Sequence, residues 1–176
     1  IRTYAAHVNG LVGGRSTATA MWLSRRSPDK AIDPGLLDNL IGGGIPAGAS
    51  VAATMVRESW EEAGIPAVIA ATATHEGEVR ACRAQADGLQ RETVFVHDLW
   101  LDREFTPSNQ DGAAVEHRLV TLDEAAAIVG HDRGPDLTTA DASLVILDFL
   151  LRHGEFDPDS PSGRELGALR YPSLDL

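Results

Sequence analysis

Cysteine, aromatic residues and basic charge are all scarce in this sequence of 176 residues. The single cysteine, Cys82, excludes a disulfide within the chain and is typical of a reducing compartment, so we expect a cytoplasmic protein. Fifteen lysines and arginines against 26 aspartates and glutamates give a formal net charge of −11. A chain this acidic is a poor candidate for a nucleic-acid partner, because such binding depends on basic surface.

Long apolar runs are also missing, although 43% of the residues are hydrophobic. A membrane span needs about 20 consecutive apolar residues, so we expect a soluble globular protein with no membrane partner. The length suits one domain with a substantial core, and we predict a single domain over residues 1–176. The sequence gives no indication of the oligomeric state.

What the sequence does contain is a glycine-rich stretch at residues 42–50, followed by a helical pattern over residues 51–63. Ser50 is a suitable N-cap, and Gly64 is a suitable left-handed residue to end the helix. On a helical wheel, the carboxylates of Glu58, Glu61 and Glu62 share one face. The opposite face is expected to pack on a core and consists of Ala52, Val56, Ser59, Trp60 and Ala63.

Three carboxylates at this spacing repel one another by roughly a few tenths of a kcal/mol per pair. Glu61 and Glu62 also lie near the negative C-terminal end of the helix dipole. A divalent cation would turn this repulsion into attraction, and carboxylate oxygens are the ligands that Mg²⁺ and Mn²⁺ prefer. A solvated acidic face is the alternative interpretation of the same three residues.

Residues 57–65 (RESWEEAGI), with Gly43 at a fixed distance before them, resemble the signature of the Nudix hydrolases. That signature is Gly, five residues, Glu, seven residues, and Arg-Glu-apolar-x-Glu-Glu-x-Gly-apolar. The sequence departs from it at Ala49, in place of the first Glu, and at Ser59, in place of an aliphatic residue. The Glu that is missing at Ala49 is more often a supporting residue in the family, so its loss bears on the rate more than on metal binding.

The resemblance implies a metal site of Glu58, Glu61 and Glu62 that holds Mg²⁺ or Mn²⁺. The backbone at Gly43 and Gly44 can approach the metal or a substrate phosphate closely, because neither residue has a side chain. Arg57 lies beside the acidic face, where it either orients a carboxylate or forms a surface ion pair.

Six segments resemble one subgroup, the Nudix domain of thiamine pyrophosphokinase-related proteins of fungi and plants. These segments are residues 4–10, 22–27, 34–38, 44–48, 109–112 and 148–154. Members of this subgroup commonly lack the first Glu as well, and they carry an additional N-terminal domain. The chain is therefore consistent with the C-terminal part of a longer protein.

The function implied is an Mg²⁺-dependent pyrophosphohydrolase that cleaves a small organic diphosphate to the monophosphate. The subgroup implies thiamine diphosphate or its oxidised or damaged analogues as the substrate. Two alternatives stay open at this point. One is a nucleotide-sugar or ADP-ribose pyrophosphatase, and the other is a diphosphate-binding module that has lost catalysis, which Ala49 suggests.

The general base that takes a proton from water is expected outside the helix. Glu92 is the first candidate, because residues 92–96 resemble the acid-bearing strand of isopentenyl diphosphate isomerase, a fold relative. Glu116 is the second candidate and Asp111 the third. Arg25 and Arg26 are candidates for binding substrate phosphate, and strand alternation allows at most one of them to face the cleft.

Hydrophobic periodicity predicts strands over residues 3–12, 20–25, 67–79, 92–101 and 114–120, the first two forming a hairpin. It predicts further helices over residues 123–129, 141–153 and 164–169, and a polar stretch at 81–91. Strands before, between and after helices indicate an α/β fold with a mixed β-sheet flanked by helices. The resemblance implies the α/β/α sandwich of the Nudix fold.

Overall fold

The computed structural model describes residues 1–14, 17–85 and 88–171. Within them, seven strands form one mixed sheet in the order β3-β2-β1-β6-β5, with β4 paired to β1 and β7 paired to β2. The strands are β1 (Arg2–Gly14), β2 (Thr17–Arg26), β3 (Leu37–Asn39), β4 (Ile41–Gly44), β5 (Thr74–Gln85), β6 (Gly88–Trp100) and β7 (Ala114–Thr121). The helices are α1 (Val51–Ala63), α2 (Ala67–Ala70), α3 (Leu122–Val129), α4 (Ala140–Arg152) and α5 (Pro161–Leu169).

Strand β1 is the central strand and has three neighbours. It runs parallel to β6 along its length, from Arg2 opposite Arg91 to Leu11 opposite Trp100. Its other edge is shared, because residues 5–8 pair with β4 and residues 10–14 pair with β2, both antiparallel. This sharing fixes the glycine-rich β4 directly beside the first half of β1.

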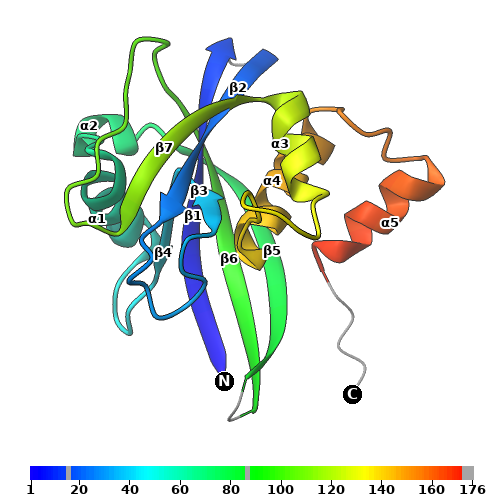
Figure 1. Ribbon diagram of the computed structural model, residues 1–176, viewed down its shortest axis with the longest axis horizontal. Coiled ribbons are helices and arrows are strands. Elements are labelled where there is room, and N and C mark those ends of the chain that lie inside the picture. The colour runs from blue at the N-terminus through cyan, green and yellow to red at the C-terminus, as the bar shows by residue number, and fades with distance from the viewer. Residues whose placement is uncertain (15–16, 86–87, 172–176) are drawn as a thin grey trace.

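Helices cover both faces of the sheet, with α1 and α2 on one side and α3, α4 and α5 on the other (Figure 1). Alternation along β1 separates the two faces. Ala6 and Val8 belong to the hydrophobic cluster that contains Met55 of α1, whereas Ala5 belongs to the cluster that contains Val145 of α4. The predicted mixed sheet flanked by helices in three layers is confirmed.

A chain of buried polar side chains crosses the sheet beneath α4. Arg152 donates hydrogen bonds to both carboxylate oxygens of Asp98, at 2.8 and 3.1 Å. Asn9 donates to Asp98 at 2.9 Å, and Asn39 donates to Asn9 at 3.2 Å. The chain ends at His7, whose Nδ1 lies 2.8 Å from Oδ1 of Asn39. Each of these buried groups therefore has a partner, as desolvated polar groups require.

The strand predicted over residues 67–79 is wrong in its first half. Residues 67–70 form the short helix α2, and β5 begins only at Thr74. The amide of Ile69 donates to the carbonyl of Pro66 at 2.9 Å, so the chain turns into a helix directly after the proline. A short apolar run is compatible with either a helix or a strand, and periodicity alone does not separate them.

The stretch at residues 81–91, which the sequence shows only as polar, is regular strand in its described part. Strand β5 continues to Gln85 and β6 starts at Gly88, so the two strands pair along this stretch as a hairpin. The tip, residues 86–87, lies outside the described residues. The hydrophobic pattern does not show these strands, because backbone hydrogen bonds between them, rather than buried side chains, stabilise the outer end of the hairpin.

The packed face of α1 differs from the predicted one. Ser59 and Ala63 are buried as expected, but Ala52 is exposed and Trp60 is 53% exposed. The helix instead buries Thr54, Met55, Ser59, Glu62 and Ala63. The buried face is therefore rotated so that one of the three carboxylates, Glu62, belongs to it.

The predicted hairpin is formed by β1 and β2, and the later predicted strand and helices correspond to β7, α3, α4 and α5. Helix α5 starts earlier than predicted, because Ser160 caps it by accepting a hydrogen bond from the amide of Gly163. In the part of the chain that the structure describes, no helix combines the length and the apolar character that crossing a membrane requires.

Candidate active site

Helix α1 is held at both ends by the residues that its sequence predicts. The Ser50 hydroxyl accepts a hydrogen bond from the amide of Ala53 at 3.1 Å, which satisfies one free donor at the N-terminus. Gly64 has a φ of 66°, and its amide donates to the carbonyl of Trp60 at 2.9 Å. These caps fix the length of α1 and therefore the positions of the carboxylates on its last two turns.

The glycines of β4 lie against these carboxylates. The amide of Gly42 donates a hydrogen bond of 2.8 Å to Oε2 of Glu62. A Cβ atom on Gly43 would lie only 2.3 Å from Cγ of Glu58, closer than two carbon atoms can approach. A side chain at position 43 would therefore displace the Glu58 carboxylate, whereas a Cβ on Gly44 would meet nothing within 4 Å.

Burial has a strong effect on two of the three carboxylates. Removal from water raises the pKa of Glu62 to about 8, against the opposing effect of the hydrogen bond from Gly42. Burial also raises the pKa of Glu58, which the positive charge of Arg57 partly offsets. At neutral pH without a cation, Glu62 is thus mainly protonated.

Arg57 bridges the two more accessible carboxylates. Its guanidinium donates to Glu58 Oε1 at 2.6 Å and to Glu61 Oε2 at 3.0 Å. The Glu61 side chain is 35% exposed, compared with 13% for Glu58. Arg57 is itself 47% exposed, so its contacts with the two carboxylates are ion pairs at the surface of the helix.

A cavity of about 300 Å³ opens beside this helix. Six of the residues proposed from the sequence line it: Arg26, Gly43, Gly44, Glu58, Glu62 and Glu92. Arg57 contacts Glu58, and Glu61 contacts Arg57, but neither Arg57 nor Glu61 is part of the lining. The structure thus brings together residues from four separate segments of the chain.

Arg25 and Glu116 lie outside this lining and contact each other. Nε of Arg25 donates to Glu116 at 2.7 Å, and its Nη2 donates to Asp136 at 2.7 Å. Of the two adjacent arginines only Arg26 lines the cavity, in agreement with strand alternation. Arg26 is itself held by Asp38, to which it donates at 2.9 Å.

Asp111, the third candidate base, is exposed in the loop before β7 and also lies outside the lining. Its Oδ1 accepts hydrogen bonds from the amide of Ala113 at 2.8 Å and from the side chain of Asn109 at 3.0 Å. The negative charge of Asp111 contributes to the raised pKa of Glu58, so this loop affects the site electrostatically without lining it.

Glu92 belongs to a second group of charges in the lining of this cavity, together with Arg83 and Asp141. Arg83 forms an ion pair with Asp141 and lies 3.5 Å from Glu92 Oε2. Burial raises the pKa of Glu92, and the nearby Asp141 raises it further. A carboxylate with a raised pKa in a cavity is suited to proton transfer near neutral pH.

Sequence reasoning missed Arg83, Asp141 and Lys30, all of which line the cavity. Arg83 falls in the stretch that the sequence shows only as polar, and the sequence predicts Asp141 only as the start of a helix. None of the three has a local pattern that marks it, because their convergence depends on the packing of β5, α4 and the loop after β2.

The donor set fits an oxygen-preferring divalent cation. Two carboxylates with raised pKa values, Glu58 and Glu62, lie against a glycine strand whose backbone is accessible. A cation there would take the place of the proton on Glu62 and would relieve the repulsion between the two acids. Among the described residues, no three His, Cys, Asp or Glu side chains already converge as a ready-made ligand cluster.

Comparison with known proteins identifies the family of this chain. Residues 4–140 match the family model described as NUDIX domain. Nudix hydrolase 24, chloroplastic, of Arabidopsis thaliana is 39% identical over 166 residues, which are 94% of this chain but 44% of that protein. This chain thus spans less than half the length of that relative.

Solved structures share the fold at low sequence identity. A MutT protein from Methanosarcina mazei Go1 superposes with a TM-score of 0.60 and 19% identity, over 87% of this chain and 96% of that one. The NUDIX domain of Shewanella oneidensis NrtR, solved with ADP ribose, gives a TM-score of 0.58 and 13% identity, over 82% and 84% of the two chains. At these identities the likeness supports the α/β fold alone.

Proposed function

This chain belongs to the Nudix family, and we propose that it is an Mg²⁺-dependent pyrophosphohydrolase that cleaves an organic diphosphate to the monophosphate. The observation that carries the proposal is the pair of buried carboxylates, Glu58 and Glu62, set against the glycines of β4 in a charged cavity. Nudix hydrolases in general use divalent cations, and Mg²⁺ is the specific ion that we propose.

Glu58 and Glu62 would hold the ion, with Glu61 oriented beside them by Arg57. When bound, the ion neutralises charge on the diphosphate. The chain contributes two further cations, Arg26 and Lys30, to the lining of the same cavity. Guanidinium and ammonium groups so placed stabilise the additional negative charge that develops as water attacks phosphorus.

Glu92 is the base that we propose for the attacking water. It lines the cavity, its pKa is raised by burial, and Arg83 at 3.5 Å limits the directions in which its carboxylate can point. Glu116 is less suited to this role because it is bound to Arg25 outside the lining. The comparison of Glu92→Gln with Glu116→Gln tests the assignment directly.

We expect Glu92→Gln to lower kcat by 100-fold or more with little change in KM, because a base acts mainly in the transition state. Glu116→Gln is the matched control and should retain most of the activity. If the two variants were equally active, or if Glu116→Gln were the more impaired, Glu92 would not be the base.

We propose thiamine diphosphate or an oxidised analogue as the substrate. The cavity of about 300 Å³ lies at the lower end of the range for ligand pockets, which favours a compact diphosphate. ADP-ribose is the second candidate, and the NrtR domain solved with ADP ribose is the observation that favours it. A nucleotide sugar belongs to the same class of alternative.

The assay incubates purified protein and Mg²⁺ with thiamine diphosphate, oxidised thiamine diphosphate and ADP-ribose, and separates the products by chromatography. We expect the highest kcat/KM for one of the two thiamine compounds and no turnover by Glu58→Gln. Faster cleavage of ADP-ribose would overturn the substrate while keeping the reaction. Saturable binding of all three compounds with no turnover would instead favour a non-catalytic module, the role that Ala49 suggests.

The place in the cell is a separate proposal. The single Cys82 suits a reducing compartment, and we propose the cytoplasm. Cell fractionation followed by detection with an antibody tests this, and recovery of the protein mainly in an organelle fraction would contradict it.

A further inference from the structure

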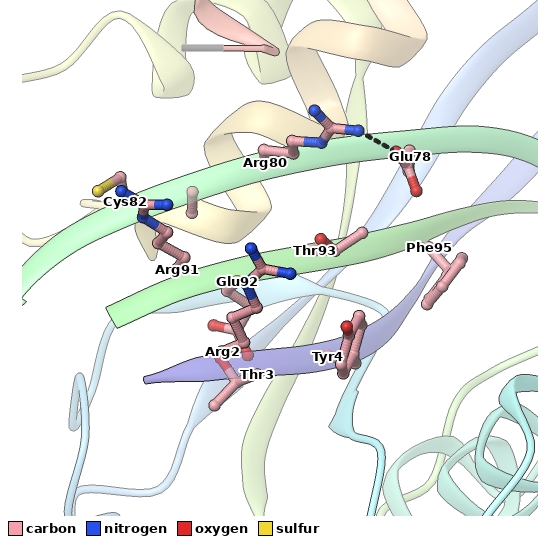
Figure 2. Close-up of a pocket in the computed structure, with 11 residues that line it drawn as sticks. Arg2, Thr3, Tyr4, Glu78, Arg80, Cys82, Arg91, Glu92, Thr93 and Phe95 are labelled. Atoms are coloured by element: carbon pink, nitrogen blue, oxygen red, sulfur yellow. Dashed lines mark hydrogen bonds and ion pairs between the residues drawn. The ribbon is translucent and has the colours of Figure 1, made fainter. Parts of the chain in front are cut away.

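The sheet face that α1 covers continues uncovered toward the N-terminal end of β1. A second cavity of about 390 Å³ lies there, over β1, β6 and β5 (Figure 2). Its side chains include Arg2, Tyr4, Arg80, Arg91 and Phe95. Arg2 and Tyr4 alternate with Ala5, which packs toward α4, so this cavity opens on the opposite face of the sheet from α4.

Arg2 and Arg91 form a pair of like charges in this cavity. They are register partners in the parallel pairing of β1 with β6, so both side chains leave the sheet on the same side. Like charges directly opposite one another destabilise a sheet. Within residues 1–14, 17–85 and 88–171, neither guanidinium forms a hydrogen bond or an ion pair.

Arg80 on β5 adds a third cation to the same face. It lies opposite Thr93 in the pairing of β5 with β6, and its guanidinium donates to Glu78 at 2.8 Å. The lining therefore holds three guanidiniums against two carboxylates, Glu78, which pairs with Arg80, and Glu92, so this patch is positive in a chain whose net charge is −11. Such a local reversal of sign is suited to an anionic ligand.

Two aromatic rings lie beside the arginines. The rings of Tyr4 and Phe95 are stacked, with centroids 6.4 Å apart and an interplanar angle of 23°. Tyr4 is 48% exposed, so the pair presents an accessible edge and face to a ligand. Figure 2 shows both rings at one end of the cavity and Arg2 and Arg91 at the other.

We propose that this cavity binds a small phosphorylated aromatic molecule of the nucleoside monophosphate class. The phosphate lies between Arg2 and Arg91, where a guanidinium donates two parallel hydrogen bonds to phosphate oxygens. The flat base packs on Tyr4 and Phe95. The phosphate removes the repulsion between the two arginines, and the volume of about 390 Å³ accommodates a mononucleotide.

The site differs from the cavity of Glu58 and Glu62 in face, charge and chemistry, although Glu92 contributes to the lining of both. Binding there therefore needs no divalent cation. This independence separates the proposal from the pyrophosphohydrolase assignment, and either can fail without the other.

The test is a titration of ¹⁵N-labelled protein with adenosine monophosphate, and separately with inorganic phosphate, in the presence of EDTA. We expect saturable shifts of the amides of residues 2–4 and 91–95 and none at residues 42–44. Arg91→Gln should weaken adenosine monophosphate at least 10-fold. Arg133→Gln, which removes the same charge from a side chain that is 90% exposed in a loop, should leave affinity unchanged.

Tyr4→Ala separates the two halves of the ligand. It should weaken adenosine monophosphate at least fivefold and leave inorganic phosphate unaffected, whereas Arg91→Gln should weaken both. Equal losses in Arg91→Gln and Arg133→Gln would reduce the effect to general charge and overturn the proposal. Shifts confined to the amides of residues 42–44, or the absence of saturable shifts, would also overturn the proposal. The spectrum of each variant shows whether that variant is folded.

Discussion

Replacement of Glu62 by glutamine removes a buried proton-binding group with almost no change in shape. In the native protein the amide of Gly42 donates a hydrogen bond of 2.8 Å to Oε2 of Glu62. The side-chain oxygen of glutamine can accept the same hydrogen bond. Glutamine cannot ionise. Comparison of the two proteins therefore isolates the effect of the Glu62 charge on stability.

The size of this effect follows from the pKa of Glu62, which burial raises from 4.5 to about 8. Between these two values the folded protein keeps a proton that the unfolded chain has lost, so stability falls as pH rises. The contribution is fully present below the unfolded pKa and is lost by the time pH passes the folded pKa. From pH 5.5 to pH 7.5, linkage gives a loss of about 2.5 kcal/mol for the native protein relative to Glu62→Gln.

The assay is urea unfolding followed by circular dichroism in EDTA, with both proteins at pH 5.5 and pH 7.5. We expect the difference in unfolding free energy between them to shift by about 2.5 kcal/mol in favour of the variant at the higher pH. Addition of Mg²⁺ at pH 7.5 should stabilise the native protein and not the variant, because the cation replaces the proton. A difference that stays constant with pH would refute the argument that Glu62 is protonated when folded.

Two further predictions concern close packing and the buried polar chain. Gly43→Ala places a Cβ 2.3 Å from Cγ of Glu58. We therefore expect the free energy of unfolding, measured by thermal unfolding, to fall by about 1–3 kcal/mol and turnover to fall at least 10-fold. Gly44→Ala is the control and should leave the unfolding temperature unchanged, because its Cβ would meet nothing within 4 Å. Arg152→Met removes the guanidinium that donates to the buried Asp98 carboxylate. We expect the free energy of unfolding, measured in urea, to fall by about 3–5 kcal/mol. A loss below about 1 kcal/mol would show that water takes the place of the guanidinium.

Helix α1 and its two caps could be predicted from the sequence because the information is local. Ser50 and Gly64 act within one turn of the helix that they bound, through hydrogen bonds to Ala53 and Trp60. The same holds for Thr121, whose hydroxyl accepts a hydrogen bond from the amide of Glu124 at the start of α3. Capping residues carry their structural effect in their own side chains, so they can be recognised without tertiary contacts.

The face that α1 buries could not be predicted in this way. Trp60 would be expected to pack on a core by its hydrophobicity, and Glu62 would be expected to face solvent by its charge. The structure reverses both, because the amide of Gly42 meets Glu62 at the edge of β4. Which side of a helix is covered depends on the strand that approaches it, and that strand is contributed by another segment.

The candidate site shows the same division between local and distant information. Gly43, Glu58 and Glu62 form one motif in sequence, and all three line the cavity. Arg83 and Asp141 also line this cavity and come from segments that have no motif in common. Their role depends on how β5 packs against α4, which only the assembled fold determines.

The buried chain from His7 to Arg152 also bears on where this protein can be cut. A fragment that ended before α4 would lose Arg152 and leave the Asp98 carboxylate with no cation under an uncovered sheet. It would also expose Ala5, Val94 and Val96, which now pack against Val145. Helix α4, through Asp141, is therefore part of the lining of the cavity that holds Glu58 and Glu62, and trimming it for expression would be expected to yield an aggregating product.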